Sequence, residues 1–310
     1  MTAMQIHLPF NDQSGECLGI GPSQGLVYAI DSEIVIKMPF QYAVVEDPDE
    51  HHLLELSLRS FISLEKELAV YATLKAHPHP NFVRRLETGQ SDCLFLERLE
   101  PLERAWPRST EPERRRWALE LLDAVSWLEA HGWADGDLAV RNLGVDGSNR
   151  LKLFDFGSAV HSSHPDYAID VVRDHFELAT CLHYILSGID PLKNLRSYAE
   201  VKEVRAQLAG GHGVIGPGAE VLADIIHDGW TGRSSSTSFG QIYRRVSCLF
   251  RSIAGAATLP ERPESHYQRL ESRCRDWLGR ASRNARFQEI EGYVRDCKAV
   301  GLDADLDVWR

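Results

Sequence analysis

Residues 134–159 are the stretch that most constrains how this chain can fold. They read ADGDLAVRNLGVDGSNRLKLFDFGSA, with an Asp-Gly pair at 146–147 between two apolar runs. Such a pair between apolar runs predicts a β-hairpin, which would fold Asn142 and Asp155 back beside each other. Together with Asp137, these side chains are oxygen ligands of the kind that Mg²⁺ prefers.

Length and composition restrict the class of protein. The chain has 310 residues, of which 43% are hydrophobic, enough for one large or two ordinary domains with sizeable cores. We find neither an apolar run long enough to span a membrane nor a signal peptide at the start, so we expect a cytoplasmic or nuclear protein. The net charge of −11 disfavours a nucleic acid or an anionic membrane as the main partner, since either requires a basic face. The six cysteines stand singly, which predicts reduced, mostly buried thiols.

The first hundred residues are predicted to be rich in strands. The runs CLGIGPSQGLVYAI and EIVIKMPF are typical of paired strands joined by a turn at 31–32, and NFVRRLETG and CLFLERL indicate two further strands. Residues 51–76 have apolar side chains at steps of three and four, which predicts one long helix with Glu65 and Glu67 on its other face.

The rest of the chain is predicted to be mainly helical. Thr110 and Glu113 have the spacing of a capping box at the start of a helix that ends at Gly132. Residues 168–187 are apolar on most sides, which indicates a core helix. Beyond residue 255, apolar residues at helical spacing predict a helical extension, which we expect to pack on the larger, helical domain.

The polar motifs resemble those of the protein kinase family. That family has a catalytic loop ending in D-L-x-x-x-N and a metal site in D-F-G, which stand here as DLAVRN at 137–142 and DFG at 155–157. The order of the other parts agrees: a glycine-rich hairpin at 19–27, IVIK ending at Lys37, a helix with Glu67, and FLERL further on. The resemblance covers residues 16 to about 250, and in detail the chain resembles kinase-like proteins of filamentous fungi.

This resemblance implies an α+β, bilobal protein-kinase-like fold. The N-lobe, at 16–100, would be a small β-sheet with one long helix that binds nucleotide. The C-lobe, at 101–255, would be larger, mainly helical, and would hold the catalytic loop and the metal site. A segment at 1–15 would precede these lobes, and the helical extension at 256–310 would follow them.

The resemblance also implies roles for residues of the first lobe, with ATP and Mg²⁺ as cofactors. Lys37 would hold the α and β phosphates of ATP and pair with Glu67. The backbone amides of a glycine-rich loop would approach the phosphates, and apolar and backbone groups would surround the adenine. These nucleotide-binding residues are Gly19, Gly21, Gly25, Val27, Val35, Leu96, Glu97 and Leu99.

In the second lobe the resemblance implies the chemistry. Asp137 would accept the proton of the substrate hydroxyl, and Asn142 and Asp155 would hold Mg²⁺. Arg141 would supply the charge of a lysine that often stands where this chain has an alanine. Asp174 would anchor the core helix under the catalytic loop.

Several positions depart from the family pattern. Asp135 and Gly136 replace the usual His-Arg, so the arginine that receives an activation-loop phosphate is absent. Val35 stands where the family favours alanine, and Gly144 stands where a bulky apolar residue usually floors the adenine. We therefore expect the base pocket to be narrowed at Val35 and open at Gly144, where a larger side chain would fit.

The segment between Asp155 and Asp174 is short and contains no Ala-Pro-Glu, which leaves the substrate class open. The sequence predicts an ATP-dependent kinase that acts on a hydroxyl group of a protein. The alternatives are a small-molecule kinase of the same fold and a catalytically silent kinase-like binding module, against which the retained Lys37, Glu67 and Asp137 argue.

Overall fold

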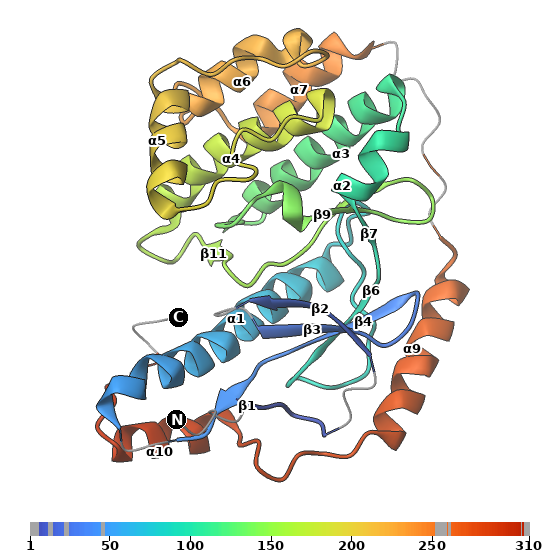
Figure 1. Cartoon of the computed structure of the whole chain (residues 1–310). Helices are drawn as coiled ribbons and strands as arrows, with labels where there is room; N and C mark the ends of the chain where they lie inside the picture. The colour runs from blue at the N-terminus through green and yellow to red at the C-terminus, as the bar shows by residue number, and fades with distance from the viewer. Residues whose placement is uncertain are drawn as a thin grey trace. The chain divides into compact units, whose positions relative to one another are not determined.

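The computed structural model describes residues 6–11, 15–21, 25–44, 47–251, 259, 262–304 and 306. It has a mixed α/β fold with small antiparallel sheets and many helices (Figure 1). The chain forms two compact units. Unit 1 comprises residues 1–75, 84–98 and 262–310, and unit 2 comprises residues 76–83 and 99–261. No helix in these described ranges is both long and apolar enough to cross a membrane.

Unit 1 is built on a four-stranded antiparallel sheet in the order β2-β3-β4-β6. Its strands are β2 (Glu16–Gly21), β3 (Gly25–Ala29), β4 (Ile34–Met38) and β6 (Leu94–Glu97). The predicted hairpin is present: β3 pairs with β4, and the Asp31 carboxylate accepts hydrogen bonds from the backbone N–H groups of Glu33 and Ile34. A second, two-stranded sheet pairs β1 (Ile6–His7) with β5 (Gln41–Tyr42).

The strand predicted in NFVRRLETG is wrong. The segment forms only isolated bridges, from Phe82 to Leu153 and from Arg85 to Leu96. Because its backbone pairs with a different strand at each end, it cannot extend one continuous ladder. Two hydrogen bonds still fix its second half, from Leu86 N–H to the Phe95 carbonyl and from Glu97 N–H to the Arg84 carbonyl.

One long helix, α1 (His51–Ala76), follows the short 3-10 helix η1 (Pro48–Glu50), as the apolar spacing predicted. Leu54, Leu58 and Leu64 are buried on it. The expectation that Glu67 faces away from the core is wrong, because this side chain is 0% exposed. A buried carboxylate needs a charged or hydrogen-bonding partner, and the pair it forms is described below.

The C-terminal helices belong to unit 1, which corrects the expectation that they pack on the larger helical domain. Helix α9 (Glu264–Arg280) joins the sheet core through Tyr267, Leu270 and Cys274. Helix α10 (Ile290–Ala299) packs Tyr293 and Cys297 against Leu54 and Leu58 of α1. Apolar periodicity showed that these helices have a buried face but could not show which core would cover it.

Unit 2 is mainly helical (Figure 1). Its helix α3 begins at the predicted capping box and packs on α4 and α7, and α4 packs on α6. The predicted hairpin of residues 143–153 is present as β9 and β10. The helices are α2 (Leu102–Ala105), η2 (Trp106–Arg108), α3 (Glu111–Ala130), η3 (Val140–Asn142), α4 (Tyr167–Ser187), α5 (Tyr198–Ala209), η4 (Glu220–Leu222), α6 (Ala223–Trp230) and α7 (Phe239–Leu249). The strands are β7 (Glu100–Pro101), β8 (Trp133–Ala134), β9 (Leu143–Val145), β10 (Leu151–Leu153) and β11 (Val160–His161).

The packing of α10 on α1 makes a testable prediction about Tyr293. This side chain is 2% exposed, and its hydroxyl donates a 2.8 Å hydrogen bond to the Tyr42 carbonyl. Tyr293→Ala should lower the free energy of unfolding by about 3 kcal/mol or more, because it leaves a cavity. Tyr293→Phe should cost only about 1 kcal/mol, the value of one hydrogen bond.

Chemical denaturation measures these differences, and Tyr198→Ala is the matched control because Tyr198 is 84% exposed. A Tyr293→Ala variant as stable as the Tyr198→Ala variant would show that α10 does not pack on α1.

Candidate functional site

Unit 1 contains a buried ion pair. The Nζ of Lys37 lies 2.6 Å from Oε2 of Glu67, and the two side chains are 5% and 0% exposed. Strand β4 places Lys37 between two neighbouring strands, and α1 places Glu67 on its buried face. The pairing that the family resemblance implied is thus present, whereas Glu65, two residues before Glu67 on the same helix, is only half-buried.

Burial makes this pair informative. Removing two charges from water costs several kcal/mol per ion, so an ion pair is a poor way to stabilise a core that apolar residues could fill. A buried lysine of the sheet paired with a buried glutamate of α1 is instead suited to positioning the ammonium group. That role in nucleotide binding stays a prediction.

The glycine-rich hairpin is formed by β2 and β3, and Gly21 at the end of β2 pairs with Gly25 at the start of β3. Residues 22–24, at its tip, lie outside the described part of the chain. Gly25 has φ +102°, and a Cβ there would lie 2.6 Å from the Met38 carbonyl oxygen, so the backbone requires glycine. At Gly19 a Cβ would meet nothing within 4 Å, so packing does not require a glycine at that position.

The predicted adenine-contacting residues lie at separate places. Val35 and Leu96 are buried and face each other across the β4–β6 pair, and Val27 in β3 is half-buried. Glu97 ends β6, where its backbone N–H is bonded to the Arg84 carbonyl and its carboxylate accepts a hydrogen bond from the Arg84 N–H. Leu99 belongs to unit 2. Their contact with a base stays a prediction.

The expectation of open space at Gly144 is wrong. Because β7 pairs with β9 there, a Cβ on Gly144 would lie 2.7 Å from Cβ of Leu99 and 3.1 Å from the Glu100 carbonyl oxygen. The side chain of Leu99 already fills the position, so a leucine at residue 144 would be overpacked rather than accommodated.

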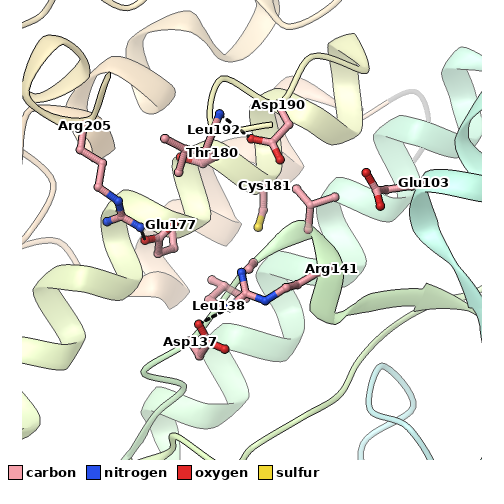
Figure 2. A pocket seen from close by; sticks show the side chains of 12 residues that line it. Glu103, Asp137, Leu138, Arg141, Glu177, Thr180, Cys181, Asp190, Leu192 and Arg205 are labelled. Carbon is pink, nitrogen blue, oxygen red and sulfur yellow. Dashed lines mark hydrogen bonds and ion pairs between the residues drawn. The ribbon is translucent and has the colours of Figure 1, made fainter. Parts of the chain in front are cut away.

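In unit 2, hydrogen bonds from two neighbouring residues orient the side chain of Asp137, in the loop before the hairpin. Arg141 donates a 2.5 Å hydrogen bond to Oδ1 of Asp137, an ion pair that Figure 2 shows. The Nδ2 of Asn142 donates to the backbone carbonyl of Asp137 at 2.9 Å and lies 3.4 Å from its Oδ2. The Asp137 carboxylate is therefore oriented by an arginine and an amide, an arrangement suited to a positioned proton acceptor.

A buried carboxylate shapes the backbone of the same loop. Asp174 on α4 accepts hydrogen bonds from the N–H of Asp135 at 2.7 Å and from the N–H of Gly136 at 3.0 Å. Oδ1 of Asp135 in turn accepts the N–H of Asp137 at 3.1 Å. Asp174 therefore anchors α4 under the loop, as expected, and Asp135 adds a second acceptor that sequence reasoning did not find.

Gly136 is required by packing. It has φ +75°, and a Cβ at this position would lie 2.4 Å from the carbonyl oxygen of Ser158. The segment after Asp155 thus passes too close to the loop for the arginine that the family has at this position.

Asn142 and Asp155 stand at the same end of the hairpin. Leu143 pairs with Leu153, and the N–H of Phe154 donates to the Asn142 carbonyl at 3.1 Å. Asp155 follows directly with φ +69°, a sparsely populated backbone state for a residue other than glycine. Because Nδ2 of Asn142 donates to Asp137, Oδ1 is the amide atom of Asn142 that is left to serve as a metal ligand.

These donors fit Mg²⁺, which takes one or two protein oxygens and completes its shell with water and phosphate. In the described part of the chain, no group of three or more His, Cys, Asp or Glu side chains could hold a metal ion by itself. A metal at Asn142 and Asp155 would therefore depend on oxygens from a bound phosphate.

Part of the chain is similar to part of a known protein kinase. No protein-family model matches the chain. The serine/threonine-protein kinase PKH2 of Saccharomyces cerevisiae is 28% identical over 119 residues, which cover 36% of this chain and 11% of the yeast protein. This weak and partial similarity suggests a relation to protein kinases and does not extend to a particular activity.

The buried carboxyl groups make the stability depend on pH. Burial raises the pKa of Asp174 to about 7, and burial together with the neighbouring Asp174 charge raises the pKa of Asp135. An unfolded aspartate loses its proton near pH 4, so between about pH 4 and about pH 7 the folded state binds more protons than the unfolded state. These two groups should therefore make the fold less stable as pH rises through that window.

Asp135→Asn resembles the protonated carboxyl group and should reduce this loss. The measurement is the urea midpoint at about pH 5 and about pH 7.5 for the wild type, Asp135→Asn, and the control Asp224→Asn, whose side chain is 89% exposed. If the Asp135→Asn variant loses as much stability between the two values as the control does, folding does not raise the pKa of Asp135.

Proposed function

We propose that this chain is an ATP-dependent phosphotransferase of the protein-kinase-like type. It transfers the γ-phosphate of Mg-ATP to a hydroxyl group of a protein. The observation that carries the proposal is the arrangement of Asp137, whose carboxylate is oriented by Arg141 and Asn142 in a loop anchored by a buried aspartate.

The two units supply different parts of this chemistry. In unit 1, the ammonium group of Lys37, held by Glu67, neutralises phosphate charge. In unit 2, Asp137 accepts the proton of the acceptor hydroxyl, while Asn142 and Asp155 provide metal ligands. Mg²⁺, when bound, offsets the negative charge of the phosphates during transfer.

A small-molecule kinase of the same fold is the second candidate. It is supported by the short segment after Asp155, which is held on its own unit: β11 pairs with β8, and the N–H of Ser162 donates to the Gly132 carbonyl. Such a segment leaves little chain for docking an extended peptide. The silent-module alternative is disfavoured because Lys37, Glu67, Asp137, Asn142 and Asp155 are all retained.

The first test is binding followed by turnover. Mg-ATP at about a hundred times its dissociation constant should stabilise the fold by about 2.7 kcal/mol, which a thermal melt detects. Asp155→Ala should reduce this shift by weakening metal binding. Asp137→Asn should keep the shift and lower turnover by about 10² to 10⁴, the value of a positioned general base.

Three outcomes test different parts of this proposal. No melting shift with Mg-ATP in the wild type contradicts nucleotide binding altogether. A shift without turnover in either the wild type or Asp137→Asn supports a silent module. Equal turnover in the two proteins rules out Asp137 as the base.

A further inference from the structure

Unit 2 has a cavity beside Asp137. Its volume is about 260 Å³, and it is lined by the loop at 137–141, by Glu103 of α2, by α4 and the segment after it, and by Arg205 of α5 (Figure 2). It can hold one small molecule or one or two side chains of a peptide, with Asp137 at its wall.

The cavity is lined by more negatively charged than positively charged side chains. Four carboxylates and two guanidinium groups line it: Glu103, Asp137, Glu177, Asp190, Arg141 and Arg205. Each guanidinium is already paired inside the cavity, Arg141 with Asp137 and Arg205 with Glu177. Both arginine charges are thus used, and carboxylate charge remains in excess.

Asp190 is the lining carboxylate without a close ion pair, although the charge of Lys193 acts on it at longer range. Its Oδ1 accepts the N–H of Leu192 at 2.8 Å, and among the described residues it forms no ion pair. Glu103, the other carboxylate not paired with a lining arginine, is 2.7 Å from Lys193. A half-buried carboxylate facing a cavity attracts a cation, because a charge of opposite sign there replaces lost hydration.

A second feature points to a ligand in the same space. Cys181 is 0% exposed, yet its side chain lines the cavity, and Figure 2 shows the thiol directed into it. Within the described part of the chain this thiol makes no hydrogen bond. Burial raises the pKa of Cys181 well above that of a free thiol, so it faces the cavity as a neutral group.

We propose that this cavity binds the acceptor substrate, and that the acceptor carries a cationic group beside its hydroxyl. The inference rests on the proposed phosphotransferase function and adds the substrate class. The hydroxyl lies at Asp137 and the ammonium or guanidinium group at Asp190. Two sources have this chemistry: a free amino alcohol or amino sugar, and a serine with a neighbouring arginine in a peptide.

The transfer step then balances as follows. The hydroxyl oxygen of the acceptor forms a bond to the γ-phosphorus of ATP, and its proton passes to Asp137. The bond between the γ-phosphorus and the bridging oxygen breaks, and ADP leaves with that electron pair. The cationic group takes no part in bond making and fixes the hydroxyl in place.

The experiment compares cationic probes with their neutral counterparts. Calorimetry without nucleotide measures the binding of glucosamine against N-acetylglucosamine, and of a short peptide with serine between arginines against its citrulline version. The cationic member of the productive pair should bind the wild type about tenfold more tightly, as expected for a hydrogen-bonded charge. The sugar pair and the peptide pair distinguish the two sources.

Two substitutions test whether Asp190 causes the preference for cationic probes. Asp190→Asn should abolish the tenfold preference and leave the melting shift with Mg-ATP unchanged. Asp224→Asn removes the same charge from an exposed site on α6 and should keep the preference. Circular dichroism shows whether each variant is folded.

Two results overturn the inference: no preference for either cationic probe in the wild type, or a preference that survives Asp190→Asn. Because calorimetry needs no nucleotide, these results are independent of whether Mg-ATP binds. A missing Mg-ATP shift contradicts the proposed function instead.

Discussion

Two hydrogen bonds to the carboxylate of Asp174 set the geometry on which the candidate chemistry depends. They fix the N–H groups of Asp135 and Gly136, and Asp135 then fixes the N–H of Asp137. Burial of Asp174 and Asp135, together with the charges of neighbouring carboxylates, raises the pKa of both. The fold tolerates that cost, and it gains a rigid backbone under Asp137.

Unit 1 shows the same principle with opposite charges. The ion pair of Lys37 and Glu67 is buried, so both side chains have little freedom to move. Helix α1, which carries Glu67, is covered by α10 through Tyr293 and Cys297. The C-terminal helices therefore contribute to the stability of the unit that holds the lysine. In both units, apolar packing keeps charged groups in defined positions.

Local patterns predicted much of the fold. The β9–β10 hairpin, α1, the capping box of α3 and the core helix α4 follow from turn residues and apolar periodicity. Packing partners did not follow, because periodicity shows that a helix has a buried face without showing what covers it. The placement of α9 and α10 was therefore wrong, and so was the exposed position of Glu67.

For the candidate site, too, local motifs predicted the residues but not what packs around them. The motifs indicated Asp137, Asn142 and Lys37, but open space at Gly144 was expected from a missing side chain in the sequence. In the structure Leu99 occupies that space, since β7 brings it against β9. The cavity residues Glu177, Asp190 and Arg205 have no sequence signal, because they come together only when α4 and α5 fold.

We propose that Lys37 and its buried partner serve phosphoryl transfer rather than stability. Phosphorus NMR of Mg-ATP with the wild type, Lys37→Ala and Lys75→Ala tests it most directly, under conditions in which circular dichroism shows all three folded. Lys75 is the control because its side chain is 71% exposed in the same unit. We predict that Lys37→Ala consumes ATP at least about a hundredfold more slowly than Lys75→Ala, because electrostatic stabilisation of the transferring group is lost. Equal rates in the two variants would contradict the account.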